Sequence, residues 1–375
     1  MRKYFLWLLL ASFAVLSLTT LRSIAPDLLT KQLAAFGLGA CLFYGLSRLP
    51  FSFYLRHSKY AYWLINLLLL GLVVYGEAMR GTAGWISLPF GWNLQPSQFA
   101  LPVTALYALS LWPKQQILNW RSLLQLTTVI GIPFVLIFIS PDFGTAMVFV
   151  VALGTLLWLH RLPWRYAVGL GAAALAAALL LWTVVFQDYQ RDRVLGFLHL
   201  QSAAKLGVAS TLEYAAAPTR TSEQSPAVYN ARQALIAVGS GGVWGRGLGH
   251  GVQSHLRFLP ERQTDFIFAS FAEEWGLVGA SILLSLYLGL LLFLLFISAQ
   301  LPDFAAGAYV QILLVMLLVQ TFINIGMNMS LLPITGITLP LMSYGGSSVL
   351  AVMMSLGVVQ SLLGGLKKAP FYTFY

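Results

Sequence analysis

Charged residues are scarce in this chain, and acidic residues are the scarcest. Only 9% of its 375 residues are charged, and Asp and Glu together number 12. Soluble domains carry roughly 25% charged residues, so this composition excludes an ordinary soluble domain. Cys41 is the only cysteine. An intramolecular disulfide is therefore excluded, and Cys41 is expected to be a small buried or lipid-facing residue.

Long apolar segments are what the chain has instead. Hydrophobic residues make up 58% of it, and the mean hydropathy is +0.78. A helix needs about 20 apolar residues to cross the roughly 30 Å hydrocarbon layer. Ten candidate segments lie near 4–21, 32–47, 60–76, 98–111, 123–139, 146–159, 166–186, 266–296, 309–325 and 346–363. The sequence predicts an all-α integral membrane protein of about ten transmembrane helices, forming a single polytopic domain over residues 1–375.

Basic residues predict the orientation of these helices. If the N-terminus is cytoplasmic, the cytoplasmic segments hold Arg2, Lys3, Arg48, Arg56, Lys59, Lys114, Arg121, Arg161, Arg165, Lys367 and Lys368. The short outer loops hold only Arg22, Lys31 and Arg80. This is a positive-inside pattern with both termini in the cytoplasm. It accounts for the net charge of +10 without a nucleic-acid partner. Asp303 is the one acidic residue away from the outer side.

One outer loop is long. Residues 187–265 precede the eighth predicted helix, and 201–228 within them are rich in small and polar residues, which predicts a mobile insertion. Seven glycines follow between 239 and 251. They match neither the P-loop nor the Rossmann pattern. Glycine turns can still expose N–H groups that hold phosphate oxygens.

Three further outer segments are unusual. Residues 81–100 are rich in Gly, Pro and Trp, which predicts either an interfacial aromatic belt or a re-entrant loop beside a cavity. Asp142 precedes a helix and is expected to cap it. Residues 324–348 contain helix-breaking prolines. The histidines 250 and 255 are poorly spaced for zinc, and "SYGGSS" matches the serine nucleophile elbow only loosely.

Acidic residues concentrate where the long loop meets the eighth helix. Glu261, Asp265, Glu273 and Glu274 fall within fourteen residues. Carboxylates near a membrane indicate function by default. Together with arginines 191, 193, 246 and 257 they predict an outward-opening polar cavity for an anionic substrate that needs proton transfer, such as a lipid-linked sugar diphosphate. Glu273 would lie about 12 Å deeper than Asp265, whereas Glu274 would need its own partner and Glu261 would pair with an arginine.

Long motifs at the outer segments form a specific pattern. They are "FLPERQTDFIFASFAEEWGLVG", "IAVGSGG" with "WGRGLGHG" and "QS", "NIGM" with "LLPITGITLPLMSYGGSS", "DYQR", the Gln-Pro-Ser at 95–97 and the Pro-Asp at 141–142. In these motifs, which span nearly the whole chain, the sequence resembles the shape, elongation, division and sporulation (SEDS) family, whose members include RodA and FtsW. The pattern is closer to RodA, with FtsW as the near alternative.

The resemblance implies a peptidoglycan glycosyltransferase that polymerises lipid II on the outer face of the bacterial cytoplasmic membrane. It implies a class B penicillin-binding transpeptidase as partner, with other members of an elongation or division complex. Inverting transfer to a sugar hydroxyl needs a general base, and Asp265 matches the family's essential aspartate. The leaving diphosphate needs positive charge from arginines or from a divalent cation, Mg or Mn. The predicted substrate-binding residues are Trp85, Gln95, Ser97, Gln98, Asp142, Arg191, Gln233, Arg246, Gln253, Ser254, Glu261, Glu273 and Ser343, with no residue predicted as a metal ligand.

Four positions depart from the family pattern. Gly84, Gln98, Leu101 and Gln263 stand where the family usually has Arg, Glu, Lys and His. Losing a Glu and a Lys together costs far less than losing one partner of an ion pair. The departures therefore indicate either tolerance or altered, weaker activity. Two alternatives stay open: a weakened scaffold for a transpeptidase, and a flippase of lipid-linked precursors. The confinement of acidic residues to the outer side favours an enzyme over a flippase.

Overall fold

The structure is a computed structural model, and it describes residues 2–75, 77–79, 82–88, 92–112, 114, 119–140, 142–166, 168–169 and 226–364. Its elements are α1 (Arg2–Ile24), η1 (Pro26–Leu28), α2 (Leu29–Ser47), α3 (Phe51–Tyr75), β1 (Glu77–Met79), β2 (Thr82–Leu88), β3 (Trp92–Leu94), α4 (Ser97–Leu111), α5 (Trp120–Ile139), α6 (Phe143–Leu159), α10 (Pro226–Ser240), α11 (Val252–His255), α12 (Ile267–Gln300), α13 (Phe304–Asn328) and α14 (Gly346–Leu362).

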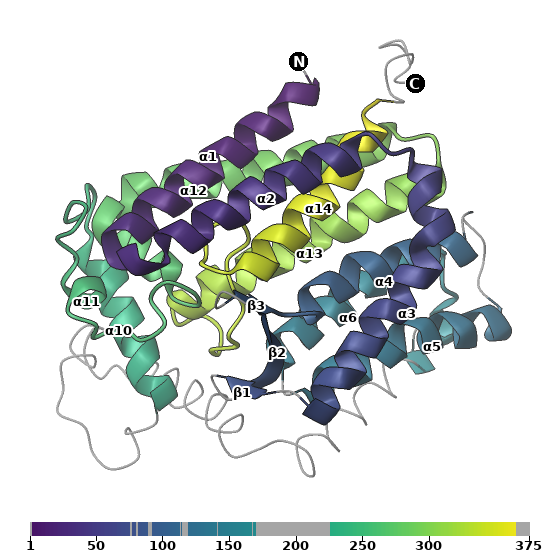
Figure 1. The fold of residues 1–375 in the computed structure, drawn as a ribbon, viewed down its shortest axis with the longest axis horizontal. Helices are drawn as coiled ribbons and strands as arrows, with labels where there is room; N and C mark the ends of the chain where they lie inside the picture. The colour runs from purple at the N-terminus through teal and green to yellow at the C-terminus, as the bar shows by residue number, and fades with distance from the viewer. Residues whose placement is uncertain are drawn as a thin grey trace.

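The molecule is mostly helical and membrane-embedded. Within the residues that the structure describes, six helical segments are long and apolar enough to cross a membrane: α1, η1 with α2, α3, α5, α12 and α13. The shorter apolar helices α4, α6 and α14 also coincide with predicted spans. The seventh predicted span, 166–186, lies almost entirely outside the described residues, as does most of the insertion at 201–228. The start of α1 and the end of α14 lie at the same end of the molecule (Figure 1).

Small residues allow close packing between helices. The main pairs are α2 with α14, α12 with α13, α3 with α4, and α6 with α13. At the first of these, a Cβ on Gly357 would lie 3.0 Å from the backbone oxygen of Phe43, so a larger residue would force the helices apart. Lipid tails give no hydrophobic drive between helices, and membrane helices associate through such close contacts.

The first outer segment corrects the all-α prediction. Strands β1, β2 and β3 form an antiparallel sheet in the order β1-β2-β3, with Ile86 opposite Leu94 and Leu88 opposite Trp92. Backbone groups at the membrane surface must find partners, and here strand pairing supplies them. Gln95 N then donates to Ser347 Oγ of α14 at 2.9 Å, which ties the sheet to the helices.

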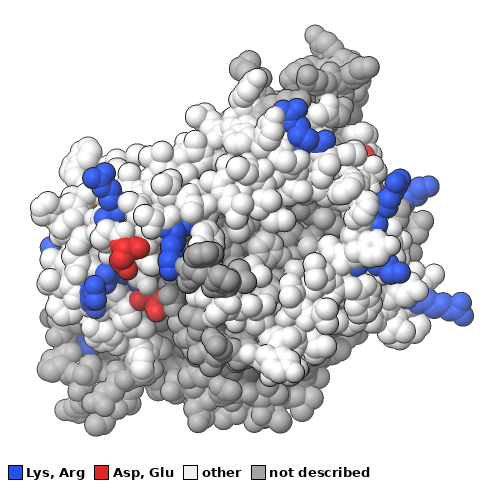
Figure 2. Space-filling view, viewed as in Figure 1, with Lys and Arg blue, Asp and Glu red and all other residues white. Residues whose placement is uncertain are grey.

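On the face drawn in Figure 2, the prominent acidic side chains gather at one end of the molecule, whereas Lys and Arg lie at both ends. In Figure 2 the two prominent acidic patches lie among Lys and Arg at the end that carries α10 and α11. At the opposite end the prominent charged side chains are Lys and Arg. The gathering of acidic side chains at one end agrees with the acidic pattern of the sequence, and the orientation in the membrane stays a prediction.

Candidate functional site

Asp265 lies at the end of a turn that leads directly into α12. Its side chain is half-buried. The turn closes through Phe266 N, which donates to Glu261 O at 3.2 Å, and Thr264 Oγ1 donates to Glu261 Oε2 at 3.0 Å. Glu261 has a φ of 48°, a left-handed conformation that non-glycine residues seldom adopt. Glu261 therefore shapes the turn that presents Asp265.

Two buried asparagines fix the backbone of Asp265. Asn324 Nδ2 and Asn328 Nδ2 donate to Asp265 O at 2.9 Å and 3.0 Å. Asn328 Oδ1 also accepts from Ala269 N at 3.0 Å, so α13 supplies a cap for the first turn of α12. Both asparagines are fully buried. Neither asparagine was predicted from the sequence as part of the site, although two Asn four residues apart in an apolar helix are a usable signal.

Ser343 also supports this turn from another part of the chain. Its hydroxyl donates to Thr264 O at 2.6 Å and accepts from Leu339 N at 2.8 Å. Its side chain is buried, and Tyr344 N donates to Gln263 O at 2.8 Å. The predicted substrate-binding Ser343 thus lies close to the turn that carries the predicted base, and its hydroxyl bonds two backbone groups.

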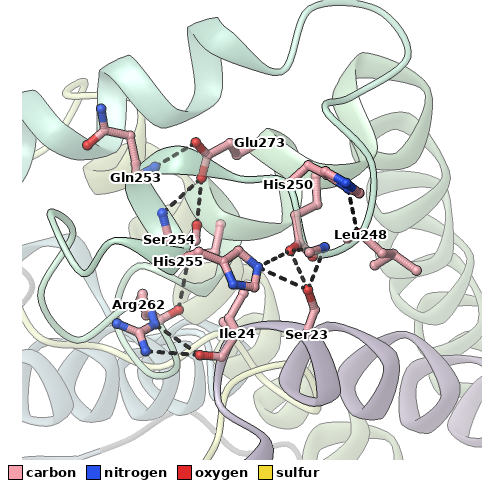
Figure 3. A network of polar contacts seen from close by, with 12 residues as sticks. Ser23, Ile24, Leu248, His250, Gln253, Ser254, His255, Arg262 and Glu273 are labelled. Atoms are coloured by element: carbon pink, nitrogen blue, oxygen red, sulfur yellow. Dashed lines mark hydrogen bonds and ion pairs between the residues drawn. The ribbon is translucent and has the colours of Figure 1, made fainter.

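Glu273 holds the short helix α11 against α12. Its Oε1 accepts from Gln253 N at 2.8 Å, and its Oε2 accepts from Ser254 N and Ser254 Oγ at 3.0 Å and 2.7 Å (Figure 3). Glu273 is 0% exposed. A carboxylate at a helix N-terminus satisfies N–H groups that have no partner within the helix. The structure brings the predicted residues Gln253, Ser254 and Glu273 together, in one structural cap.

Glu274 has the separate partner that the sequence analysis required. Its Oε1 accepts from Ser23 Oγ at 2.5 Å and from Gly249 N at 3.1 Å, and it lies 3.0 Å from His255 Nε2. Ser23 and His255 are labelled in Figure 3. The two neighbouring carboxylates thus both bind the segment 249–255: Glu273 binds residues 253 and 254, and Glu274 binds residues 249 and 255. Because Ser23 lies in the last turn of α1, the Glu274 contacts also join the first helix to α12.

Residues 239–251, here called the glycine-rich loop, bind backbone groups of α12 on both sides of a break in that helix. Gly276 has a φ of 66° and a ψ of −165°, which interrupts the single helix that was expected. The loop supplies partners on both sides of the break: Arg246 N donates to Glu273 O at 2.9 Å, and Val278 N donates to Val243 O at 3.1 Å. Gly247 N likewise donates to Glu274 O at 3.0 Å. The N–H groups of Arg246 and Gly247 are therefore used within the fold, and phosphate binding by the glycine-rich loop stays a prediction.

A second polar cluster lies at the start of α4 and α6. Asp142 Oδ2 accepts from Gln95 Nε2 and Ser97 Oγ at 2.9 Å each, and its Oδ1 accepts from Thr145 N at 3.2 Å. The predicted capping role of Asp142 is confirmed. Gln98 Nε2 donates to Gln95 Oε1 at 3.3 Å. Four predicted residues therefore form one network.

The remaining predicted residues are more dispersed. Trp85 is half-buried in β2, Gln233 is half-buried in α10, and Arg246 is exposed with its Nε donating to Ser240 O at 3.2 Å. Arg191 lies outside the described residues. The predicted cavity and the roles of these side chains in binding stay predictions.

Arg262 links the turn to the first helix. Its Nε and Nη2 donate to Ile24 O at 3.1 Å and 3.0 Å. Partial burial lowers the pKa of Arg262, the charge of Arg257 lowers it further, and Asp27 opposes the shift. An arginine stays charged at ordinary pH in spite of such a shift. It therefore keeps a positive charge two residues before Thr264.

The departures from the family pattern are accommodated by the fold. Leu101 is 4% exposed and lies in the apolar core. Gln98 belongs to the Asp142 network, and Gly84 is buried in β2. The side chains of Leu101 and Gln98 thus have partners in the fold, while the effect of the four departures on activity stays a prediction.

Comparison with known sequences identifies relatives along the chain. Residues 3–367 match the FtsW, RodA and SpoVE family, described as cell cycle proteins. The peptidoglycan glycosyltransferase MrdB of Escherichia coli K12 is 32% identical over 341 residues, which cover 89% of this chain and 85% of MrdB. An FtsW of Halothiobacillus neapolitanus, named a probable peptidoglycan glycosyltransferase, is 37% identical over 318 residues, 80% of this chain and 69% of that protein.

Solved structures show the same fold. A chain from a peptidoglycan synthase complex, studied for its coordination of polymerization and crosslinking, superposes with a TM-score of 0.77 at 27% identity and covers 98% of both chains. The rod shape determining protein RodA of Thermus thermophilus superposes with a TM-score of 0.69 at 25% identity, again over 98% of both chains. The fold, the family match and the identities agree, and the chain belongs to the SEDS family of FtsW, RodA and SpoVE.

Proposed function

We propose that Asp265 is the general base with which this chain polymerises lipid II into β-1,4-linked glycan. The broader activity is that of the relatives: this chain is a peptidoglycan glycosyltransferase acting in cell shape and elongation. What the proposal adds is the substrate, the stereochemistry and the residue that takes the proton.

The reaction needs one proton acceptor. The 4-hydroxyl of the acceptor sugar attacks the anomeric carbon of the donor while the bond to the polyprenyl diphosphate breaks. Attack from the opposite face turns the α-linked donor into a β-linked product. A base within hydrogen-bond reach of the attacking hydroxyl accepts its proton as the new bond forms. Asp265 supplies a carboxylate at the end of the molecule where the acidic residues were expected.

The support for Asp265 is the way its backbone is held. Its carbonyl accepts from two fully buried asparagines, and the preceding carbonyl, of Thr264, accepts from Ser343. The side chain itself is half-buried. A catalytic group is most effective when rigid neighbours fix its position. The fold thus fixes the main chain of this residue from α13 and from the segment before α14.

The leaving diphosphate requires positive charge. We assign this to Arg191 and Arg246, with a divalent cation, Mg or Mn, as the alternative. Among the described residues no group of three or more His, Cys, Asp or Glu side chains could hold a metal ion. A cation would therefore take ligands from the diphosphate, as Mg²⁺ does where one or two carboxylates and substrate phosphates share it.

The proposed setting is the outer face of the bacterial cytoplasmic membrane. Basic residues on the opposite end support this orientation. The partner would be a class B penicillin-binding transpeptidase in an elongation complex. The structural neighbour from a peptidoglycan synthase complex supports a crosslinking partner.

Lipid II polymerisation by the purified protein with its transpeptidase tests the assignment. Asp265→Asn keeps the size of the side chain and removes the base, so no glycan is expected. Asp303→Asn is the matched control, because Asp303 caps α13 through Ala306 N at 3.2 Å and Asn caps equally well. Wild-type glycan levels are expected from this control. Glycan from Asp265→Asn would refute the role of Asp265, and none from wild type would favour the scaffold alternative.

A further inference from the structure

Residues 243–248 form an exposed apolar loop, here called the interfacial loop. Trp244 is 80% exposed, Val243 53% and Leu248 48%. Single exposed apolar residues are ordinary on protein surfaces. Three within six residues, with the largest almost fully exposed, leave a substantial apolar area without a protein partner among the described residues.

The interfacial loop has a fixed position against α12. Leu277 N donates to Gly242 O at 2.9 Å and Val278 N donates to Val243 O at 3.1 Å. A Cβ on Gly276 would lie 2.2 Å from Gly245 N, so the two backbones touch. The loop is therefore held at the level of residues 276–278 of α12.

Helix length predicts that α12 leaves the hydrocarbon layer at about that level. A helix rises 1.5 Å per residue, so about 20 to 25 residues of a tilted helix cross the roughly 30 Å layer. Counted back from Gln300, the end of α12, they reach about residues 276–280. The exposed surface of α12 begins there, with Leu277 62% and Ile282 51% exposed.

We propose that the interfacial loop inserts into the boundary between lipid headgroups and acyl chains, with Trp244 as its anchor. Tryptophan is enriched at this boundary because its ring is apolar and its N–H is polar. The exposed Arg246 beside it suits the phosphate layer. The exposed apolar surface of α12, a helix long enough to cross the hydrocarbon layer, continues directly into the loop, and this continuity favours the bilayer as its occupant.

The anchor also fixes the depth of the candidate site. The same loop binds Glu273 O and Glu274 O through Arg246 N and Gly247 N. These residues belong to the first part of α12, which begins two residues after Asp265. An anchored loop thus holds Asp265 near the bilayer surface, where the headgroup of a lipid-linked sugar lies. The diphosphate proposed for Arg246 would lie in the same layer.

Spin labelling measures the depth directly, because Cys41 is the only native cysteine. In a Cys41→Ala background, Trp244→Cys is labelled in lipid nanodiscs, with Leu288→Cys as the hydrocarbon control and Arg48→Cys as the aqueous control. Leu288 is 57% exposed in α12, and Arg48 is exposed at the end of α2. We expect the ratio of oxygen to nickel-chelate collisions at 244 to lie between the two controls. A ratio equal to that at 48 would overturn the proposal.

A second measurement leaves the loop nearly intact. Lipids brominated near the headgroup quench tryptophan fluorescence, and the chain contains 11 Trp. Trp244→Phe should reduce the quenched part of the emission by about the share of one exposed tryptophan, with unchanged elution on size exclusion. Equal quenching of wild type and variant would place Trp244 in water. Neither measurement depends on glycosyltransferase activity.

Discussion

Replacing Glu273 by Gln tests whether the buried carboxylate holds α11 in place. The wild-type side chain accepts three hydrogen bonds with two oxygens, from Gln253 N, Ser254 N and Ser254 Oγ. An amide has the same shape and only one accepting oxygen. If that oxygen keeps the bonds to Ser254, the N–H of Gln253 faces an NH2 group and loses its acceptor.

The magnitude follows from these contacts. One buried N–H without an acceptor costs about 1–3 kcal/mol, and the remaining bonds weaken because they lose their ionic partner. Burying a neutral amide costs less free energy than burying a carboxylate, and this difference offsets part of the destabilisation. The substitution is therefore expected to lower the free energy of opening α11 by about 2 kcal/mol. This change shifts the equilibrium between closed and open forms roughly 30-fold toward the open form.

Hydrogen exchange of the backbone amides measures this opening, because exchange follows local unfolding. In Glu273→Gln, the peptide containing residues 252–255 should exchange roughly 30-fold faster at its most protected amide. Ser254→Ala is the control that removes only the hydroxyl bond. Losing that bond should lower the free energy of opening by roughly 1 kcal/mol, so exchange about fivefold faster than in the wild type is expected. Exchange in Glu273→Gln within twofold of wild type would show that the carboxylate does not hold the helix.

Two further changes probe the start of α12. Gly276→Ala should destabilise the protein by about 3 kcal/mol or more, because a φ of 66° is strained for alanine and the new Cβ would meet the glycine-rich loop. Gly289→Ala is the control, because a Cβ there would meet open space. This control should be neutral or stabilising by up to about 1 kcal/mol. Equal thermal midpoints for both variants in detergent would contradict this. Asn328→Ala should lower kcat for lipid II polymerisation with little change in KM, because one of the two donors to Asp265 O is lost; an unchanged kcat would show that this bond does not position the base.

The arrangement of apolar and charged residues along the sequence predicted much of the fold. Segments of about 20 apolar residues can be accommodated only across a membrane or in a large core, and helices now lie at nine of the ten predicted segments. Local chemistry also predicted the cap at Asp142, because a cap involves residues only three apart. The sheet at 77–94 escaped prediction because strand pairing depends on partners across a turn.

The sequence by itself determined the membrane class and the family, and it predicted Asp265 as the base through the family resemblance. Only the tertiary structure decided how the neighbouring carboxylates are used. Glu273 and Glu274 are adjacent to each other, yet one caps α11 and the other joins α1 to His255. Asn324 lies 59 residues from the carbonyl it binds. A buried polar group must be matched by whichever donors the fold brings to it, and spacing along the chain does not reveal those partners.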